Sequence, residues 1–342
     1  MGHVCTNNRA SSEVIKTSNR DFLLFSLGAV ISVALLYFAL RDMSWRALGA
    51  TLADVNIASL CLCAVGITVG ILLRGWRCCL VAGRPSRMAW MFARATNLGI
   101  LGNQLLPGRL GEFVRVFALA RLLRTGLSES LSAIVLDRVV DLAVLFLSAG
   151  VVSLAVSAEV VPGSWMVGLG IVLVIVGVGL LLLRNRYFQS WLEGWSERWL
   201  HRWALSTKSF LLVFNGMVRN LSRPRMAISI LGLAFLVWLS DCLVVTAVLW
   251  SVGLDLPLLA SLLLWVLLAA GSALPSAPGY IGIYQLAAVW GLAGYGVPPH
   301  QSVAAALVLQ VTTLVVALAM ASPEMGMLGT KIPTSNAAGL KP

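Results

Sequence analysis

The feature that most constrains the fold is a series of apolar runs long enough to cross a lipid bilayer. A helix of roughly 19 residues, rising about 1.5 Å per residue, spans a hydrocarbon core of about 30 Å. The runs that reach this length are Phe22–Leu40, Val55–Leu73, Leu131–Val156, Trp165–Leu183, Ile228–Trp250 and Ser302–Ala321. Only 11% of the residues are charged, against about 25% in soluble domains. The sequence therefore predicts an all-α, polytopic membrane protein with six full transmembrane helices.

The charges between the runs predict the orientation of the chain. Cytoplasmic loops of membrane proteins are enriched in Lys and Arg. Segments Arg74–Arg94 and Arg184–Arg225 are strongly basic, whereas Arg41–Asp54, Ser157–Ser164 and Ser251–Pro257 are neutral or acidic. We expect a multi-pass protein of the cell membrane (the inner membrane, if bacterial) with both termini in the cytoplasm. These loops also explain the net charge of +11, so we expect no nucleic-acid partner.

Two further apolar stretches, Met88–Leu106 and Leu258–Leu274, do not fit this orientation as full spans. If the first crossed the membrane, the arginines from Arg109 to Arg124 would lie outside, against the charge rule. We therefore expect two re-entrant hairpins from opposite faces. The first would break at Pro107–Gly111, and the second, Leu258–Gly296, would break at Pro275–Gly282. The alternative is a pair of tilted full spans in each region.

A short motif is repeated at the two breaks. The segment from Pro107 to Phe113 and the segment from Pro278 to Tyr284 share the pattern Pro-Gly-x-aliphatic-Gly-x-aromatic. The helix-breaking residues are Pro107, Gly108 and Gly111 in the first copy, and Pro278, Gly279 and Gly282 in the second. Inverted repeats whose broken helices meet near the bilayer midplane are typical of transporters. Pro-Gly turns also coincide by chance in a chain with 31 glycines.

Charged residues near the first break and inside two spans form the candidate site. Charges are tolerated within a membrane only where they face protein or a wet cavity. We expect Arg138 to form a paired network with Asp141 and the charges of the first break, and Asp241 to pair with Arg138 or Arg109. A purely structural salt-bridge cluster is the alternative. The candidate substrate-binding residues are Asn103, Arg109, Glu112, Arg115, Asp137, Arg138, Asp141 and Asp241.

The chemistry of this set favours a phosphate-bearing ligand. Arginine binds phosphate through a planar, permanently charged fork, and helix N-termini after the breaks add positive dipole ends. The six cysteines and three histidines show no metal-binding spacing, so we expect neither a metal nor a cofactor.

The remaining segments predict the domain organisation. Residues 1–21 are polar and form a cytoplasmic tail, residues 22–321 form one transmembrane domain, and residues 322–342 form a second, disordered tail. Four tryptophans spaced by four in Tyr187–Leu205 predict a helix lying on the cytoplasmic leaflet.

The chain resembles the transmembrane region of lysylphosphatidylglycerol synthases, a flippase-like membrane family. The matching residues are Asn103, the run from Leu106 to Glu112, Arg115, Arg138-x-x-Asp141 and Pro278-Gly-x-Ile-Gly282. In bifunctional members the membrane half is thought to move an aminoacylated phospholipid between leaflets. Their soluble aminoacyltransferase half has no counterpart here, so the resemblance implies no aminoacyl transfer.

Three positions depart from the family pattern. Asp137 stands where glutamate is usual, Tyr280 replaces a glycine, and Gln285 replaces a glutamate. The resemblance therefore does not carry over any proton-coupling role of that glutamate.

We expect a lipid translocase in which Arg109, Arg115 and Arg138 hold the phosphate of an anionic headgroup. Glu112, Asp141 and Asp241 would exchange partners as access switches sides. One alternative is a membrane enzyme acting on lipid-linked substrates, for which Asp137 and Asp141 form the nearest acidic pair. Another is a non-transporting assembly partner of envelope-lipid or glycolipid synthesis. Further partners would be a second copy of the chain or a lipid-modifying enzyme.

Overall fold

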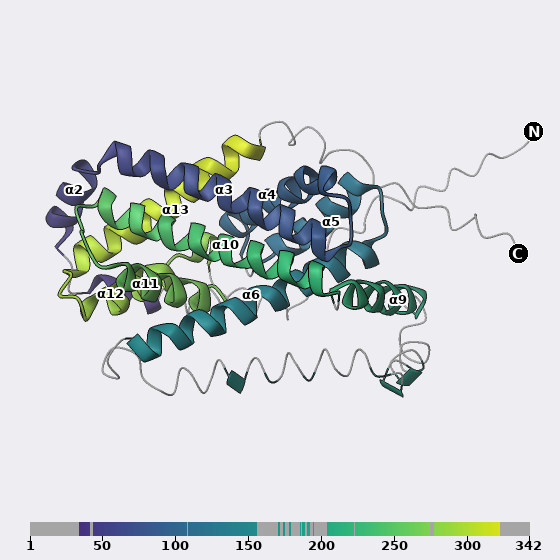
Figure 1. Ribbon diagram of the computed structural model, residues 1–342. Helices are drawn as coiled ribbons and strands as arrows, with labels where there is room; N and C mark the ends of the chain where they lie inside the picture. Colours follow the sequence, from purple (N-terminus) through teal and green to yellow (C-terminus); the bar gives the residue numbers. More distant parts are fainter. Residues whose placement is uncertain are drawn as a thin grey trace, which may run out of the picture.

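The computed structural model describes most of the chain between residues 34 and 321 (Figure 1). The described residues are 34–41, 44–107, 109–155, 204–221, 223–273 and 277–321, with scattered positions between 170 and 194. Their regular structure is helical, which confirms the predicted class. The predicted span Trp165–Leu183, most of the tryptophan-rich helix, both tails and the start of the first span lie outside the described residues.

Four long helices form the body of the molecule. They are α3 (Ile57–Val81), α6 (Leu127–Ala155), α10 (Pro224–Ser251) and α13 (Pro299–Ala321). Helices α3, α10 and α13 are long and apolar enough to cross a membrane. Helix α6 has the required length but carries Asp137, Arg138 and Asp141 near its middle. The shorter helices α2 (Trp45–Ala53) and α9 (Ala204–Leu221) flank this body at opposite ends (Figure 1).

Helix α3 extends further than the sequence predicts. The expected span ended at Leu73, with Arg74 and Arg77 in a cytoplasmic loop, and this placement is wrong. The helix continues through Arg74 and Arg77 to Val81. It does so because carboxylates on neighbouring helices neutralise both guanidinium groups.

Helices α3 and α10 approach closely at Gly66, where an added Cβ atom would lie 2.6 Å from Val244 Cγ2. At Gly70 an added Cβ atom would lie 2.9 Å from Arg74 Nη1 of the same helix and at an ordinary 3.5 Å from Ser240 Oγ of α10. The Ser240 hydroxyl donates a hydrogen bond to the Gly66 carbonyl at 3.0 Å. Small residues four apart allow such backbone approach between membrane helices.

The first predicted break is confirmed as an interruption between α4 (Ala89–Leu105) and α5 (Gly111–Leu123). At about 1.5 Å per residue the two arms measure about 26 and 20 Å, so each is too short to cross a core of about 30 Å. The arms fold back on each other at Gly111. A Cβ atom there would lie 2.1 Å from the Gly99 carbonyl oxygen, and the Gly111 N–H donates to Asn103 Oδ1 at 3.0 Å.

The second break separates α11 (Leu258–Gly271) from α12 (Ile283–Ala293). The short 3₁₀ turn η2 (Pro278–Tyr280) lies between the two helices. Side-chain amides hold this turn. Gln310 Nε2 donates to the Gly279 carbonyl at 2.6 Å, and Gln285 Nε2 donates to Gln310 Oε1 at 2.7 Å. The Gly282 N–H in turn donates to Gln285 Oε1 at 2.8 Å. These amides therefore connect both ends of the break to α13.

The two helical hairpins lie toward opposite ends of the long helices, with α4 and α5 at one end and α11 and α12 at the other (Figure 1). Their breaks meet between these ends: a Cβ atom on Gly279 would lie 3.0 Å from Gln104 Oε1. The third residue of each motif copy has a left-handed backbone, with φ of 62° at Arg109 and 60° at Tyr280. The copies are therefore alike at this residue, but they diverge at the next one, where Leu110 is helical with ψ of −14° and Ile281 is extended with ψ of 135°.

Replacing Gly111 with alanine is expected to destabilise the protein by about 1–3 kcal/mol, because the added methyl group overlaps the backbone of α4. Thermal unfolding of the detergent-purified protein measures this loss. Gly232→Ala is the matched control, since Gly232 lies in α10 with nothing within 4 Å of an added Cβ. Equal unfolding temperatures for the two variants would contradict the close approach at Gly111.

Candidate functional site

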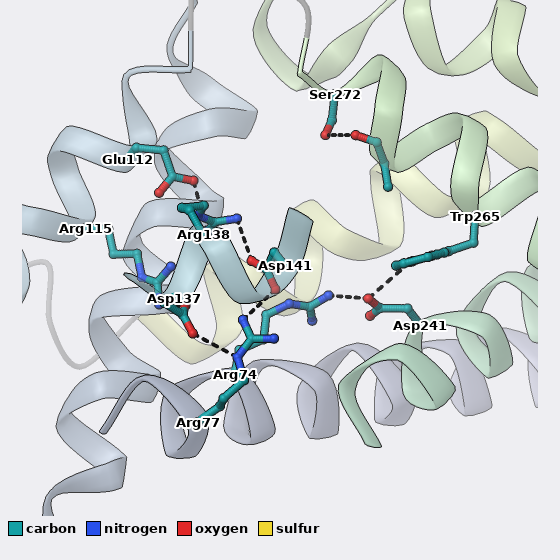
Figure 2. Close-up of polar contacts among 11 residues, drawn as sticks. Arg74, Arg77, Glu112, Arg115, Asp137, Arg138, Asp141, Asp241, Trp265 and Ser272 are labelled. Atoms are coloured by element: carbon teal, nitrogen blue, oxygen red, sulfur yellow. Dashed lines mark hydrogen bonds and ion pairs between the residues drawn. The ribbon is translucent and has the colours of Figure 1, made fainter. Parts of the chain in front are cut away.

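The site is built on a carboxylate held between two arginines. Asp137 on α6 accepts hydrogen bonds from Arg77 Nε on α3 and from Arg115 Nη2 on α5, each at 2.8 Å (Figure 2). All three side chains are at most 2% exposed. An unpaired charge in such surroundings costs several kcal/mol. This pairing therefore joins the first hairpin to α3 and α6.

A second layer of ion pairs lies next to this buried core. Asp141 accepts from Arg77 Nη2 at 2.5 Å and from Arg138 Nη1 at 3.0 Å. Arg138 Nη2 also lies 3.2 Å from Glu112 Oε1. The predicted network of Arg138 with Asp141 and Glu112 is present, and Arg115 joins it through Asp137.

Asp241 pairs with a residue that the sequence did not indicate. Its predicted partners were Arg138 or Arg109, but the structure pairs it with Arg74 of α3. Trp265 Nε1 of α11 donates to the same carboxylate at 3.2 Å (Figure 2). The prediction was wrong because the close packing of α3 on α10 brings Arg74 beside Asp241, while Arg138 is engaged by Glu112 and Asp141.

These residues surround a cavity of about 530 Å³ where the two breaks meet. One hydrophobic cluster packs around the second hairpin, and another packs around the first. The polar and aromatic side chains that line the cavity include Arg74, Arg77, Asn103, Gln104, Arg109, Glu112, Arg115, Arg138, Asp141, Trp238, Asp241, Trp265, Tyr280 and Tyr284.

The cavity has a surplus of positive charge. Four carboxylates (Glu112, Asp137, Asp141 and Asp241) face the five arginines at positions 74, 77, 109, 115 and 138, which leaves a net charge of 5 − 4 = +1. Arg109 has no carboxylate within ion-pairing distance in the described part of the chain. The surplus is therefore located at the tip of the first hairpin.

Several buried N–H groups of this network lack acceptors. Among the residues that the structure describes, Arg109 Nε, Arg115 Nη1 and Arg138 Nε are buried without a hydrogen-bond partner. Leaving a buried charged donor unsatisfied costs more than a typical hydrogen bond gains. An anion with several acceptor oxygens would satisfy these donors and neutralise the surplus charge.

The remaining predicted residues shape the two helix breaks. The Asn103 amide oxygen is occupied by the Gly111 N–H, so Asn103 closes the first hairpin. Pro107, Gly111, Pro278, Gly279 and Gly282 shape the two breaks, and Gly108 lies outside the described residues.

Arg74 and Arg77 were missed because they followed an apolar run and were counted as loop residues. The apolar residues Cys78 to Val81 that follow them were the signal that the helix continues. Trp265, Tyr280 and Tyr284 were missed because aromatic residues are common in membrane spans. Only the fold places them against the charged cavity.

Comparison with protein families gives a match over most of the chain. Residues 25–321 match the family described as "Lysylphosphatidylglycerol synthase TM region". The chain belongs to this family. The resemblance inferred from the motifs is thus confirmed, and the protein is a membrane protein of a lipid-related family. No curated protein and no solved structure matches the chain at a significant level.

Asp137→Asn is expected to destabilise the protein by about 3–5 kcal/mol, because it leaves the buried Arg115 without its carboxylate partner and Arg77 with Asp141 alone. The matched control is Glu129→Gln, which removes a carboxylate from the more exposed pair with Arg84. That change is expected to cost no more than about 1 kcal/mol. Thermal unfolding in detergent measures both, and similar losses would contradict a central role for Asp137.

Proposed function

We propose that this protein is a lipid translocase that moves a phosphate-bearing lipid headgroup through the cavity between the two breaks. In this proposal both hairpins are re-entrant and enter a multi-pass membrane domain from opposite faces, and both termini are cytoplasmic. The ligands are anionic lipid headgroups, and the protein acts as a transporter rather than as an enzyme.

The observation that carries the proposal is a cationic cavity with unsatisfied guanidinium donors, placed where two interrupted helices meet. Irregular backbone at membrane depth is tolerated where it lines a cavity. The arms of both hairpins are too short to cross, and exposed apolar side chains flank the breaks at Leu106, Leu110 and Ile281. These features support hairpin tips that lie in the bilayer, with apolar residues toward lipid and charged residues toward the cavity.

The ion pairs differ in how easily they exchange partners. The group formed by Asp137, Arg77 and Arg115 is buried, so these residues keep their partners. Arg138 is 39% exposed and is shared by Glu112 and Asp141. A phosphate entering the cavity would displace Glu112 from Arg138 and take up the free donors of Arg109 and Arg115. Glu112 is then released from Arg138, while Arg115 still holds α5 to Asp137 of α6.

The charge pattern favours transport over metal-dependent chemistry at the acidic pair. The carboxylates of Asp137 and Asp141, the nearest candidates for a metal-binding pair, are each held by two guanidinium groups. The same arginines that neutralise these acids provide donors to a phosphate.

Arg109→Gln is expected to reduce lipid movement at least tenfold while leaving the unfolding temperature unchanged, because Arg109 contributes the unsatisfied Nε donor and forms no ion pair with the residues that the structure describes. The assay reconstitutes the purified protein with fluorescent phospholipid and measures the fraction accessible to a membrane-impermeant quencher over time. The matched control is Arg87→Gln, since Arg87 is exposed and lies on the short turn before α4.

Failure of the wild-type protein to move phospholipids or polyprenyl-phosphate lipids faster than empty vesicles would overturn the proposed function. Wild-type rates in Arg109→Gln and Arg138→Gln together would overturn the assignment of the headgroup site.

A further inference from the structure

The break of the second hairpin contains a backbone conformation that its residue type disfavours. Tyr280 has φ of 60°, in the left-handed region that side chains with a Cβ atom rarely adopt. The corresponding residue of the first hairpin, Arg109, has φ of 62°. Glycine would adopt either conformation without strain. The turn alone therefore does not account for a large side chain at either position.

Contacts on both sides of Tyr280 hold this conformation. The preceding carbonyl, on Gly279, accepts the hydrogen bond from Gln310, and the Gly282 N–H is held by Gln285. The Tyr280 ring stacks on Tyr284 with centroids 5.0 Å apart and planes 8° apart. Strained residues persist where the surroundings over-determine them, and they cluster at ligand sites.

The side chain of Tyr280 faces the cationic part of the cavity. It lines the cavity together with Arg109, Glu112 and Arg138, the residues at the tip of the first hairpin and on α6, and it interacts with Arg109. A tyrosine hydroxyl both donates and accepts hydrogen bonds. The second hairpin thus presents a neutral hydroxyl to the region where the first hairpin presents Arg109, which has no carboxylate partner among the described residues.

We propose that Tyr280 is a headgroup-contacting residue whose hydroxyl donates to a phosphoryl oxygen that Arg109 also binds. The inference rests on the proposed function and specifies the site further. One anionic ligand would then be held by the third residue of both motif copies. Since each copy belongs to a different hairpin, ligand occupancy ties the two hairpins together.

The test uses four variants of the full chain: Tyr280→Phe, Tyr280→Ala, Tyr280→Gly and, as the control, Tyr295→Phe. Tyr295 lies between α12 and α13 and does not line the cavity. Each purified variant is reconstituted with fluorescent phospholipid for the transport assay, and its thermal unfolding is measured in detergent.

Tyr280→Phe is expected to slow lipid movement about tenfold, as the loss of a hydrogen bond to a charged group implies. The alanine and glycine variants are expected to be slower still, and Tyr295→Phe is expected to match the wild type. Alanine and glycine both remove the ring, but only glycine relieves the backbone strain. Tyr280→Gly should therefore unfold roughly 2–4 °C above Tyr280→Ala.

Wild-type transport in all three Tyr280 variants, in an assay where Arg109→Gln is inactive, would overturn the inference and leave the proposed function standing. Equal unfolding temperatures for the alanine and glycine variants would overturn the strained conformation on which it is based. An inactive wild-type protein would instead overturn the proposed function itself.

Discussion

The pairing of Asp137 with Arg77 and Arg115 is the interaction on which the rest of the structure depends. Each charge comes from a different helix, and Asp137 is the carboxylate that both buried arginines share. Removing one partner of such a buried pair is strongly destabilising. Arg115 reaches Asp137 because the first hairpin folds back at Gly111. Gly111 has no side chain, so its backbone packs directly against the backbone of α4. The requirement to neutralise three buried charges therefore determines how α3, α5 and α6 are arranged, and with it the position of the first break.

The positive charge that these ion pairs leave unneutralised determines the chemistry of the cavity. The ion pairs consume four of the five arginine charges, and the surplus lies at the tip of the first hairpin, at Arg109. The second hairpin has no charge at the equivalent position and presents Tyr280 instead. Its turn is held by the uncharged amides of Gln285 and Gln310. The two motif copies thus share a left-handed third residue but differ in electrostatics.

The helical class, both helix breaks and the family were predictable from the sequence, because apolar length and Pro-Gly spacing are local properties. The partners of Arg74 and Asp241 were not. Hydropathy treats a charged residue at the end of an apolar run as a loop residue, since the carboxylate that neutralises it lies on another helix. Arg74 meets Asp241 because α10 approaches α3 closely at Gly66 and because Gly70 leaves room for the Arg74 guanidinium group. Such pairings depend on the packing of distant segments, which periodicity does not record.

The proposed translocation requires that the two helix breaks meet inside the bilayer. Spin labels at Leu106 and Ile281, which flank the breaks and are exposed, test this position in reconstituted protein whose native cysteines are replaced. Collision with oxygen reports lipid, and collision with a water-soluble nickel chelate reports water. If the breaks lie in the bilayer, both labels collide more often with oxygen than with the chelate, as labels near the bilayer centre do. Labels that collide mainly with the chelate would place the breaks in surface loops and contradict the proposal.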